Sequence, residues 1–117
     1  MRYICLIYSD EASFEKMSPE EQGKLYAEYE AFRNELAAAG NVKLAGDQLK
    51  PAHTATSVRV RHGKVQTTDG PFAETKEQLG GYYILECKNL DEALKWAAKI
   101  PSAKDGTIEV RPIVDLP

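Results

Sequence analysis

The stretch Tyr3–Tyr8 reads YICLIY, and it is apolar on both of the faces that a strand presents. Successive side chains of a strand point to opposite sides of the sheet, so Tyr3, Cys5 and Ile7 share one side and the residues that alternate with them share the other. Aromatic and β-branched residues favour a strand, and the polar pair that follows ends it. A strand that is apolar on both sides is typically buried on both sides.

A long helix is predicted after this strand, beginning at Ser18 and ending at Gly40. Ser18, Pro19 and Glu21 provide an N-cap hydroxyl, a proline at the first helical position and the carboxylate of a capping box. The apolar residues of the segment repeat at intervals of four, three and four, at Leu25, Tyr29, Phe32 and Leu36. This spacing predicts a helix that packs on one face.

The remaining pattern predicts two halves that each contain a helix between strands. Further strands are expected at 42–45, 57–61, 65–67, 82–87 and 108–114, and a second helix is expected between the cap residue Asn89 and Pro101. His62, Gly63 and Lys64 form the turn that joins 57–61 to 65–67 into a half-exposed hairpin. The order of strand, helix, strand, inserted hairpin, strand, helix and strand is that of an α+β, ferredoxin-like fold.

Both helices of such a fold cover the same face of the sheet, which leaves the opposite face open. Tyr82 and Ile84 alternate with Tyr83 and Leu85, so a second strand is also apolar on both sides. A chain of 117 residues offers no third layer, so a second copy is expected to supply one. The sequence therefore predicts a homodimer whose sheets face each other.

Composition limits the class of protein. The 117 residues, 43% hydrophobic and 28% charged, fit one globular domain that covers residues 1–117. No run approaches the roughly 20 apolar residues of a bilayer span, and the N-terminus lacks the cleavage site of a signal peptide, so we expect a cytoplasmic protein without a membrane partner. The net charge is −3 with scattered basic residues, which argues against nucleic acid as the main partner.

The usual reactive side chains suggest neither a metal site nor a catalytic triad. Cys5 and Cys87 each lie in an apolar run without a neighbouring ligand, so we expect buried, reduced thiols, no metal and no cofactor. His53 and His62 lie in polar segments, where a single histidine is more often exposed than catalytic. No histidine is flanked by a nucleophile signature.

The segment TDGPFAETKEQL, residues 68–79, carries the main candidate site residues. Its twelve residues exceed the usual loop of roughly four to six, and long ordered loops are often functional. Asp69, Glu74, Lys76 and Glu77 have the combination of carboxylates and an ammonium that acid–base chemistry uses. Alternatively, Asp69 bonds the backbone of its own turn, and the other three form surface ion pairs.

Phe72 of this loop and two charged residues of the last strand are further candidates. Phe72 is expected to pack inward and anchor the loop, and it is also a candidate contact for a substrate. Glu109 and Arg111 share one face of the last strand. If that face lines a dimer cleft, Arg111 holds a substrate anion; if it lies at the rim, the two residues form a solvated edge.

The segment TTDGPFAETKEQLGGYYILE resembles the signature of the DGPF proteins, a branch of the YCII-related family. TATSVRVRHGK, NLDEALKWAAKIP and GTIEVRPI match the same pattern, so the resemblance covers nearly the whole chain. It implies a ferredoxin-like fold paired into a dimeric α+β barrel. A related chlorinated-hydroquinone dehydrochlorinase is the catalytic precedent, and the family is often associated with extracytoplasmic-function sigma factors.

The same resemblance gives two residues a role. Some related proteins pair a histidine on the first helix with an aspartate before the third main strand, and Asp69 corresponds to that aspartate. The histidine position falls on Tyr29, whose phenol is a poor base at neutral pH but can donate a hydrogen bond to an oxyanion.

Three functions follow from these observations. The first is a small-molecule enzyme of lyase or isomerase type, with Asp69 as acid or base and with Tyr29 or Lys76 orienting an oxygenated or aromatic substrate, which Glu74, Glu77, Phe72 and Arg111 would contact. The second is a regulatory partner of a sigma factor without turnover. The third is a dimeric domain in which the loop has only a structural role.

Overall fold

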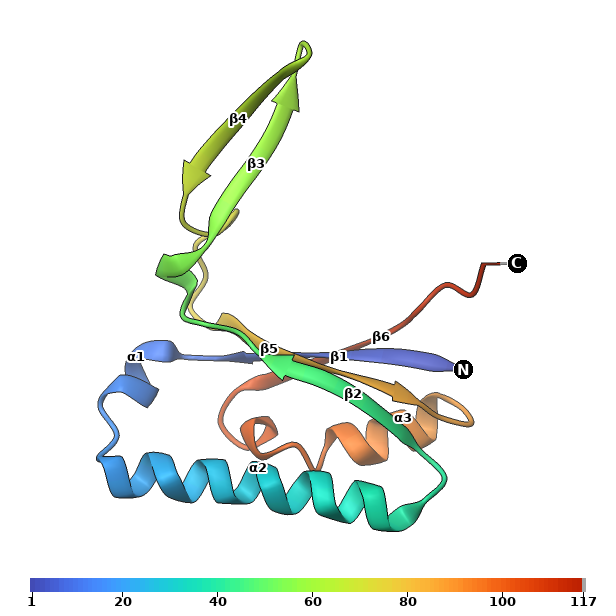
Figure 1. Ribbon diagram of the computed structural model, residues 1–117. Helices are drawn as coiled ribbons and strands as arrows, with labels where there is room; N and C mark the ends of the chain where they lie inside the picture. Colours follow the sequence, from blue (N-terminus) through green and yellow to red (C-terminus); the bar gives the residue numbers. More distant parts are fainter. Residues whose placement is uncertain (117) are drawn as a thin grey trace.

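The computed structural model describes residues 1–116, which form one four-stranded antiparallel sheet, a separate two-stranded ribbon and three helices (Figure 1). The strands are β1 (Arg2–Ser9), β2 (Lys43–Gln48), β3 (Thr56–Arg61), β4 (Lys64–Asp69), β5 (Gln78–Glu86) and β6 (Thr107–Pro112). The helices are α1 (Glu11–Glu15), α2 (Pro19–Ala39) and α3 (Leu90–Ala97), with 3₁₀ turns η1 (Ala52–Thr54) and η2 (Pro101–Ala103).

The sheet order is β2-β5-β1-β6, and both long helices lie on one side of it (Figure 1). This is the order expected when two strand-helix-strand halves interleave, so the predicted ferredoxin-like α+β fold is confirmed. The sheet of the single chain is open at β2 and β6 and forms no closed barrel within residues 1–116.

The predicted helix boundaries rest on side-chain caps that the structure contains. Ser18 Oγ accepts from the backbone of Glu21, whose carboxylate accepts from the backbone N–H of Ser18, and Gly40 ends α2 with a φ of 74°. In α3, Asn89 caps the backbone of Glu92.

The main differences from the prediction concern α1, the end of α3 and the long loop. The short helix α1 was not predicted, because its five residues are too few to show a helical period. Helix α3 ends at Ala97 instead of continuing to Ile100. The long loop is shorter than predicted, since β4 runs through Asp69 and β5 begins at Gln78, leaving residues 70–77 as the connection.

The core lies between the sheet and the two long helices. Tyr3, Cys5 and Ile7 of β1 are buried on this side, together with Phe32 and Leu36 of α2. The register places Cys5 between Tyr83 of β5 and Val110 of β6. The predicted helix stripe is thus confirmed for α2, whereas Leu90 and Leu94 of α3 are exposed and only its alanines are buried.

The opposite side of the sheet, called the outer face below, is apolar along its central strands. It is formed by Ile4 and Leu6 of β1 beside Ile84 and Tyr82 of β5, according to the register. All four are half-buried within one chain. No helix lies over this face in Figure 1, so the expected two-sided apolar character of β1 and β5 is present.

Strands β3 and β4 form a ribbon that rises from the sheet on the side of the outer face (Figure 1). His62 and Gly63 join them with positive φ values of 53° and 72°, as a tight two-residue turn requires. The predicted hairpin is confirmed, but it is almost wholly exposed. Among the residues of β3 and β4, Ser57 alone is half-buried. The Cα radius of gyration is 16.3 Å, whereas a compact chain of this length has about 13 Å.

Candidate functional site

A cavity of about 490 Å³ lies between α1, α2, the edge strand β2 and the beginning of β5. The strands carry glycine where they border it, at Gly46, Gly80 and Gly81. A register shift in the pairing of β1 with β5 separates Ile7, opposite Gly81, from Tyr8, opposite Leu79, and leaves Gly80 as the bulged residue. Because these three positions have no side chains, space remains between the sheet and α2 at this end.

Tyr29 enters this cavity from α2 and is the polar member of the helix's apolar stripe. Its hydroxyl lies 2.5 Å from Ser102 Oγ, a buried hydroxyl of η2, and either oxygen can be the donor. Burial raises the pKa of the Tyr29 phenol above its ordinary value, although the hydrogen bond with Ser102 acts in the opposite direction. The phenol is therefore protonated at neutral pH and is a hydrogen-bond donor instead of a base.

Further phenols surround Tyr29 on the wall formed by β5 and α2. The ring of Tyr83 lies 6.5 Å from that of Tyr29, centroid to centroid, and its hydroxyl accepts a hydrogen bond of 3.4 Å from Arg33 Nη1. Tyr26 stacks edge-on against Phe14 of α1 at 6.1 Å. Aromatic walls with a few polar groups are typical of small-molecule sites.

The lining of the cavity carries more negative than positive side chains. Among the described side chains, Arg33 is the one basic residue of the lining, and the acidic residues are Asp10, Glu11, Glu15, Asp47 and Asp105. Three of these also have hydrogen-bond partners: Asp10 caps α1, Glu11 Oε1 accepts from the backbone of Ala52 at 2.8 Å, and Asp47 Oδ2 accepts from the Tyr82 hydroxyl at 3.2 Å. This charge balance favours uncharged or cationic ligands over anions.

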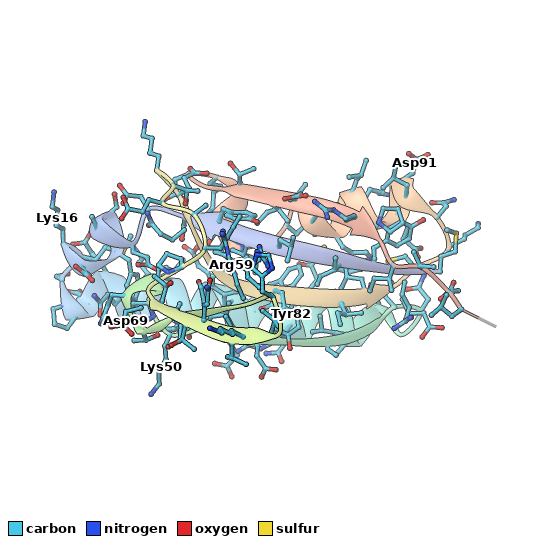
Figure 2. All side chains as sticks on the ribbon, turned by 90° about the horizontal axis from the view of Figure 1, so that it is seen from above. Lys16, Lys50, Arg59, Asp69, Tyr82 and Asp91 are labelled. Carbon is cyan, nitrogen blue, oxygen red and sulfur yellow. The ribbon has the colours of Figure 1, made fainter. Side chains whose placement is uncertain are left out.

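The structure does not bring Asp69 to the cavity. Asp69 is the last residue of β4 and is exposed, and it is not among the residues that line the space beside Tyr29. Figure 2 looks down on the outer face, where Arg59 and Asp69 belong to the ribbon in front and Tyr82 to the sheet behind it. Within one chain, Tyr29 and Asp69 therefore belong to different surfaces.

The other predicted loop residues lie outside the cavity as well. Glu74 and Lys76 are exposed, whereas Glu77 is half-buried and accepts a hydrogen bond of 2.8 Å from Thr107 Oγ1 of β6. Phe72 does not pack inward as expected: it is 79% exposed, and the guanidinium carbon of Arg59 lies 5.3 Å from its ring centre. The ring therefore packs on the exposed ribbon instead of on the core.

Arg111 and Glu109 share the outer face, opposite Ile4 and Leu6 of β1, as their spacing predicted. Their side chains form an ion pair, and β6 is an edge strand of the sheet. Both alternatives for Arg111, a contact in a dimer cleft and a solvated rim, remain compatible with this position.

Neither thiol is a nucleophile in this fold. Cys5 and Cys87 are free and buried, as predicted. Burial, with a smaller contribution from Cys87, raises the pKa of the Cys5 thiol to about 11. Burial likewise raises the pKa of Cys87. Thiols held in this way stay protonated at neutral pH.

His53 and His62 are both exposed, as expected for single histidines in polar segments. No group of three or more histidine, cysteine or acidic side chains within residues 1–116 is arranged to hold a metal ion. Among the same residues, no helix combines the length and the apolar character that crossing a bilayer requires.

Comparison with known proteins identifies the family. The model of the YCII-related domain matches residues 1–117. The chain belongs to the YCII-related family. An uncharacterised protein of Rhizobium meliloti (strain 1021) is 37% identical over 115 residues, which cover 97% of this chain and 92% of that relative. The YCII-related match does not separate branches of the family, so membership of the DGPF branch stays a prediction.

The cavity itself was missed by reasoning from the sequence. Gly46 lies more than thirty positions before Gly80 and Gly81 in the chain, and only the pairing of β2 with β5 brings it to them. The signal that was available is Tyr29, a residue with a polar tip in an otherwise apolar helix stripe.

Proposed function

We propose that this YCII-related protein binds a small molecule in the Tyr29 cavity and acts on it by acid–base chemistry. The observation that carries this proposal is a half-buried phenol that shares a hydrogen bond with a buried serine and lines a cavity large enough for a small ring compound. A few polar groups in a cavity with apolar and aromatic walls orient ligands and give specificity.

Tyr29 is proposed to donate its proton in a hydrogen bond to an oxygen of the ligand. If Ser102 donates to the phenolic oxygen, the phenol proton is free to point at the ligand, and the pair acts as one donor. Such a donor stabilises negative charge that develops on a substrate oxygen. The acidic lining makes an uncharged or cationic oxygenated aromatic compound the favoured class of substrate.

The role of Asp69 as acid or base remains a prediction from the sequence. It requires a second copy of the chain, because Asp69 stands on the exposed ribbon and does not line the cavity of the same chain. Lys76, Glu74 and Phe72 are exposed in the same region and share this requirement. Their proposed contacts with substrate therefore depend on the assembly.

The test is ligand-observed NMR with phenols, catechols and aromatic amines, and with benzoates as the anionic comparison. Tyr29→Phe is expected to weaken binding by roughly two- to tenfold, the effect of losing one hydrogen bond of about 0.5–1.5 kcal/mol. Tyr8→Phe is the matched control, because Tyr8 does not line the cavity. Equal losses in both variants, or no binding by any uncharged or cationic compound, would contradict the proposal.

We also propose that two copies stack through their outer faces, which places a second sheet about 10 Å above the first. The support is the half-buried apolar set Ile4, Leu6, Tyr82 and Ile84, over which no helix of residues 1–116 lies (Figure 1). This arrangement would produce the dimeric barrel expected from the sequence. A cytoplasmic location likewise remains a prediction.

The alternative function is a non-catalytic partner of an extracytoplasmic-function sigma factor. The exposed ribbon favours some role in protein binding, and the identity of the partner comes only from the resemblance to DGPF proteins. Co-purification of a sigma factor with the wild-type chain, lost when exposed ribbon residues are substituted, would support this alternative over the enzyme.

A further inference from the structure

The β3–β4 ribbon has two chemically different faces. Residues that alternate along a strand share a face, and cross-strand partners lie on the same face. The pairs Val58–Thr67 and Val60–Val65 form one face, and Arg59–Gln66 and Arg61–Lys64 form the other. One side of the ribbon is therefore apolar, and the other is basic.

Within residues 1–116, the apolar face of the ribbon is left exposed. Val58 is 60% exposed, Val60 57% and Val65 69%. The main contacts of β3 and β4 are with each other. A hairpin of only two strands is marginally stable in water, and clustered exposed apolar side chains mark a binding surface. The ribbon thus has the character of an arm that packs on another molecule.

We propose that this arm grips a second copy of the same chain, with its valine face packed on the partner. The inference rests on the homodimer proposed above and adds the element that holds it together. The arm rises on the side of the unpartnered outer face, so a copy stacked there comes within its reach (Figure 1).

The length of the arm supports a second copy of the chain as its partner. Each ribbon strand has six residues, which corresponds to about 20 Å. A second sheet lies about 10 Å away. The arm is consequently long enough to pass the edge of the partner's sheet and reach its helix layer.

The distribution of charge between the arm and the rest of the chain also supports a second copy as the partner. Residues 56–69 contain three basic side chains and one acidic side chain, so the arm carries +2. The whole chain carries −3, so the remainder carries −5. Helix α2 alone has five acidic and two basic residues. A basic arm on an acidic body is attracted to the body of another copy, and two arms repel each other.

The experiment is sedimentation equilibrium on the full chain over a range of protein concentrations. We expect the wild type to dimerise and the triple variant Val58→Ser/Val60→Ser/Val65→Ser to raise the dissociation constant at least about tenfold, which is 1.4 kcal/mol. Gln66→Ser, which changes an exposed side chain on the opposite, basic face of the same ribbon, is the control and should leave the constant unchanged. Raising the salt concentration should also weaken the wild-type dimer.

Hydrogen exchange provides a second measurement that does not depend on a variant. Amides of β3 and β4 are expected to be protected only at protein concentrations where the dimer forms, while β1 and β5 stay protected throughout. The proposed role of the arm is overturned if the dimer persists unchanged in the triple variant, or if the ribbon amides exchange equally fast at every concentration. Either result leaves the proposed homodimer itself standing. A wild type that stays monomeric overturns both, and the ligand experiment on Tyr29 is unaffected by either result.

Discussion

At the scale of single residues, the thiol of Cys5 has the clearest electrostatic consequence. It lies at the centre of the sheet, between Tyr83 and Val110, where burial raises its pKa to about 11 from an ordinary value of 9.0. Between these two values the unfolded chain loses the thiol proton and the folded chain keeps it. Stability therefore falls as the pH rises through this interval.

We predict that the free energy of unfolding decreases between pH 9 and pH 11 by up to about 1.4 kcal/mol per pH unit from this group. Urea unfolding at several pH values checks this, with Cys5→Ala as the comparison. The variant should be less stable at pH 8, since it leaves a small cavity, but its stability should decline less steeply. Parallel pH profiles for the two proteins would rule out this contribution.

Residues also show what the sequence can and cannot reveal. Ser18, Gly40 and Asn89 were correctly identified as helix caps, because capping depends on neighbours three or four positions away. The exposure of Phe72 was predicted wrongly, because whether a loop ring is buried depends on distant strands. The cavity beside Tyr29 depends on such long-range pairing too, so its existence was not predictable from local patterns.

At the scale of secondary-structure elements, the close approach of β2 to β5 depends on Gly46. A Cβ atom at this position would lie 2.2 Å from the carbonyl oxygen of Tyr82 and 2.7 Å from Cδ1 of Tyr83. Contacts this short force the two strands apart. Since the same strands border the cavity, this glycine shapes both the sheet edge and the site.

We predict that Gly46→Ala destabilises the protein by about 1–3 kcal/mol, the usual cost of overpacking. Gly23→Ala is the matched control: Gly23 lies in α2 with no atom within 4 Å of the added Cβ, and the change should stabilise the helix by roughly 0.5–1 kcal/mol. Urea unfolding of both variants measures the two effects. If both variants changed the free energy of unfolding in the same direction, the close contact between β2 and β5 at Gly46 would not be what determines the effect.

At the scale of the whole molecule, the feature to explain is a sheet with helices on one side only. Leu6 lies on the central strand of the outer face and is half-buried in the single chain. In the proposed dimer, Leu6 is fully buried. A lysine at this position would therefore place an unpaired ammonium in the interface, at a high cost in free energy.

We predict that Leu6→Lys converts the dimer to a monomer that keeps its secondary structure. Light scattering measures the mass, and circular dichroism checks the fold. Ala37→Lys, at an exposed position of α2, should remain a dimer. A Leu6→Lys protein with unchanged mass and normal spectrum would mean that the outer face is not the interface.

The order of the strands has one more consequence. Strands β1 and β2 precede the ribbon in the chain, and β5 and β6 follow it, yet in the sheet β5 lies between β1 and β2. A trypsin cut after Arg61 or Lys64, near the ribbon tip, would yield two fragments that are interlocked by these antiparallel ladders. The two fragments, produced separately and then mixed, should reconstitute the folded body, which makes this fold a natural candidate for fragment complementation.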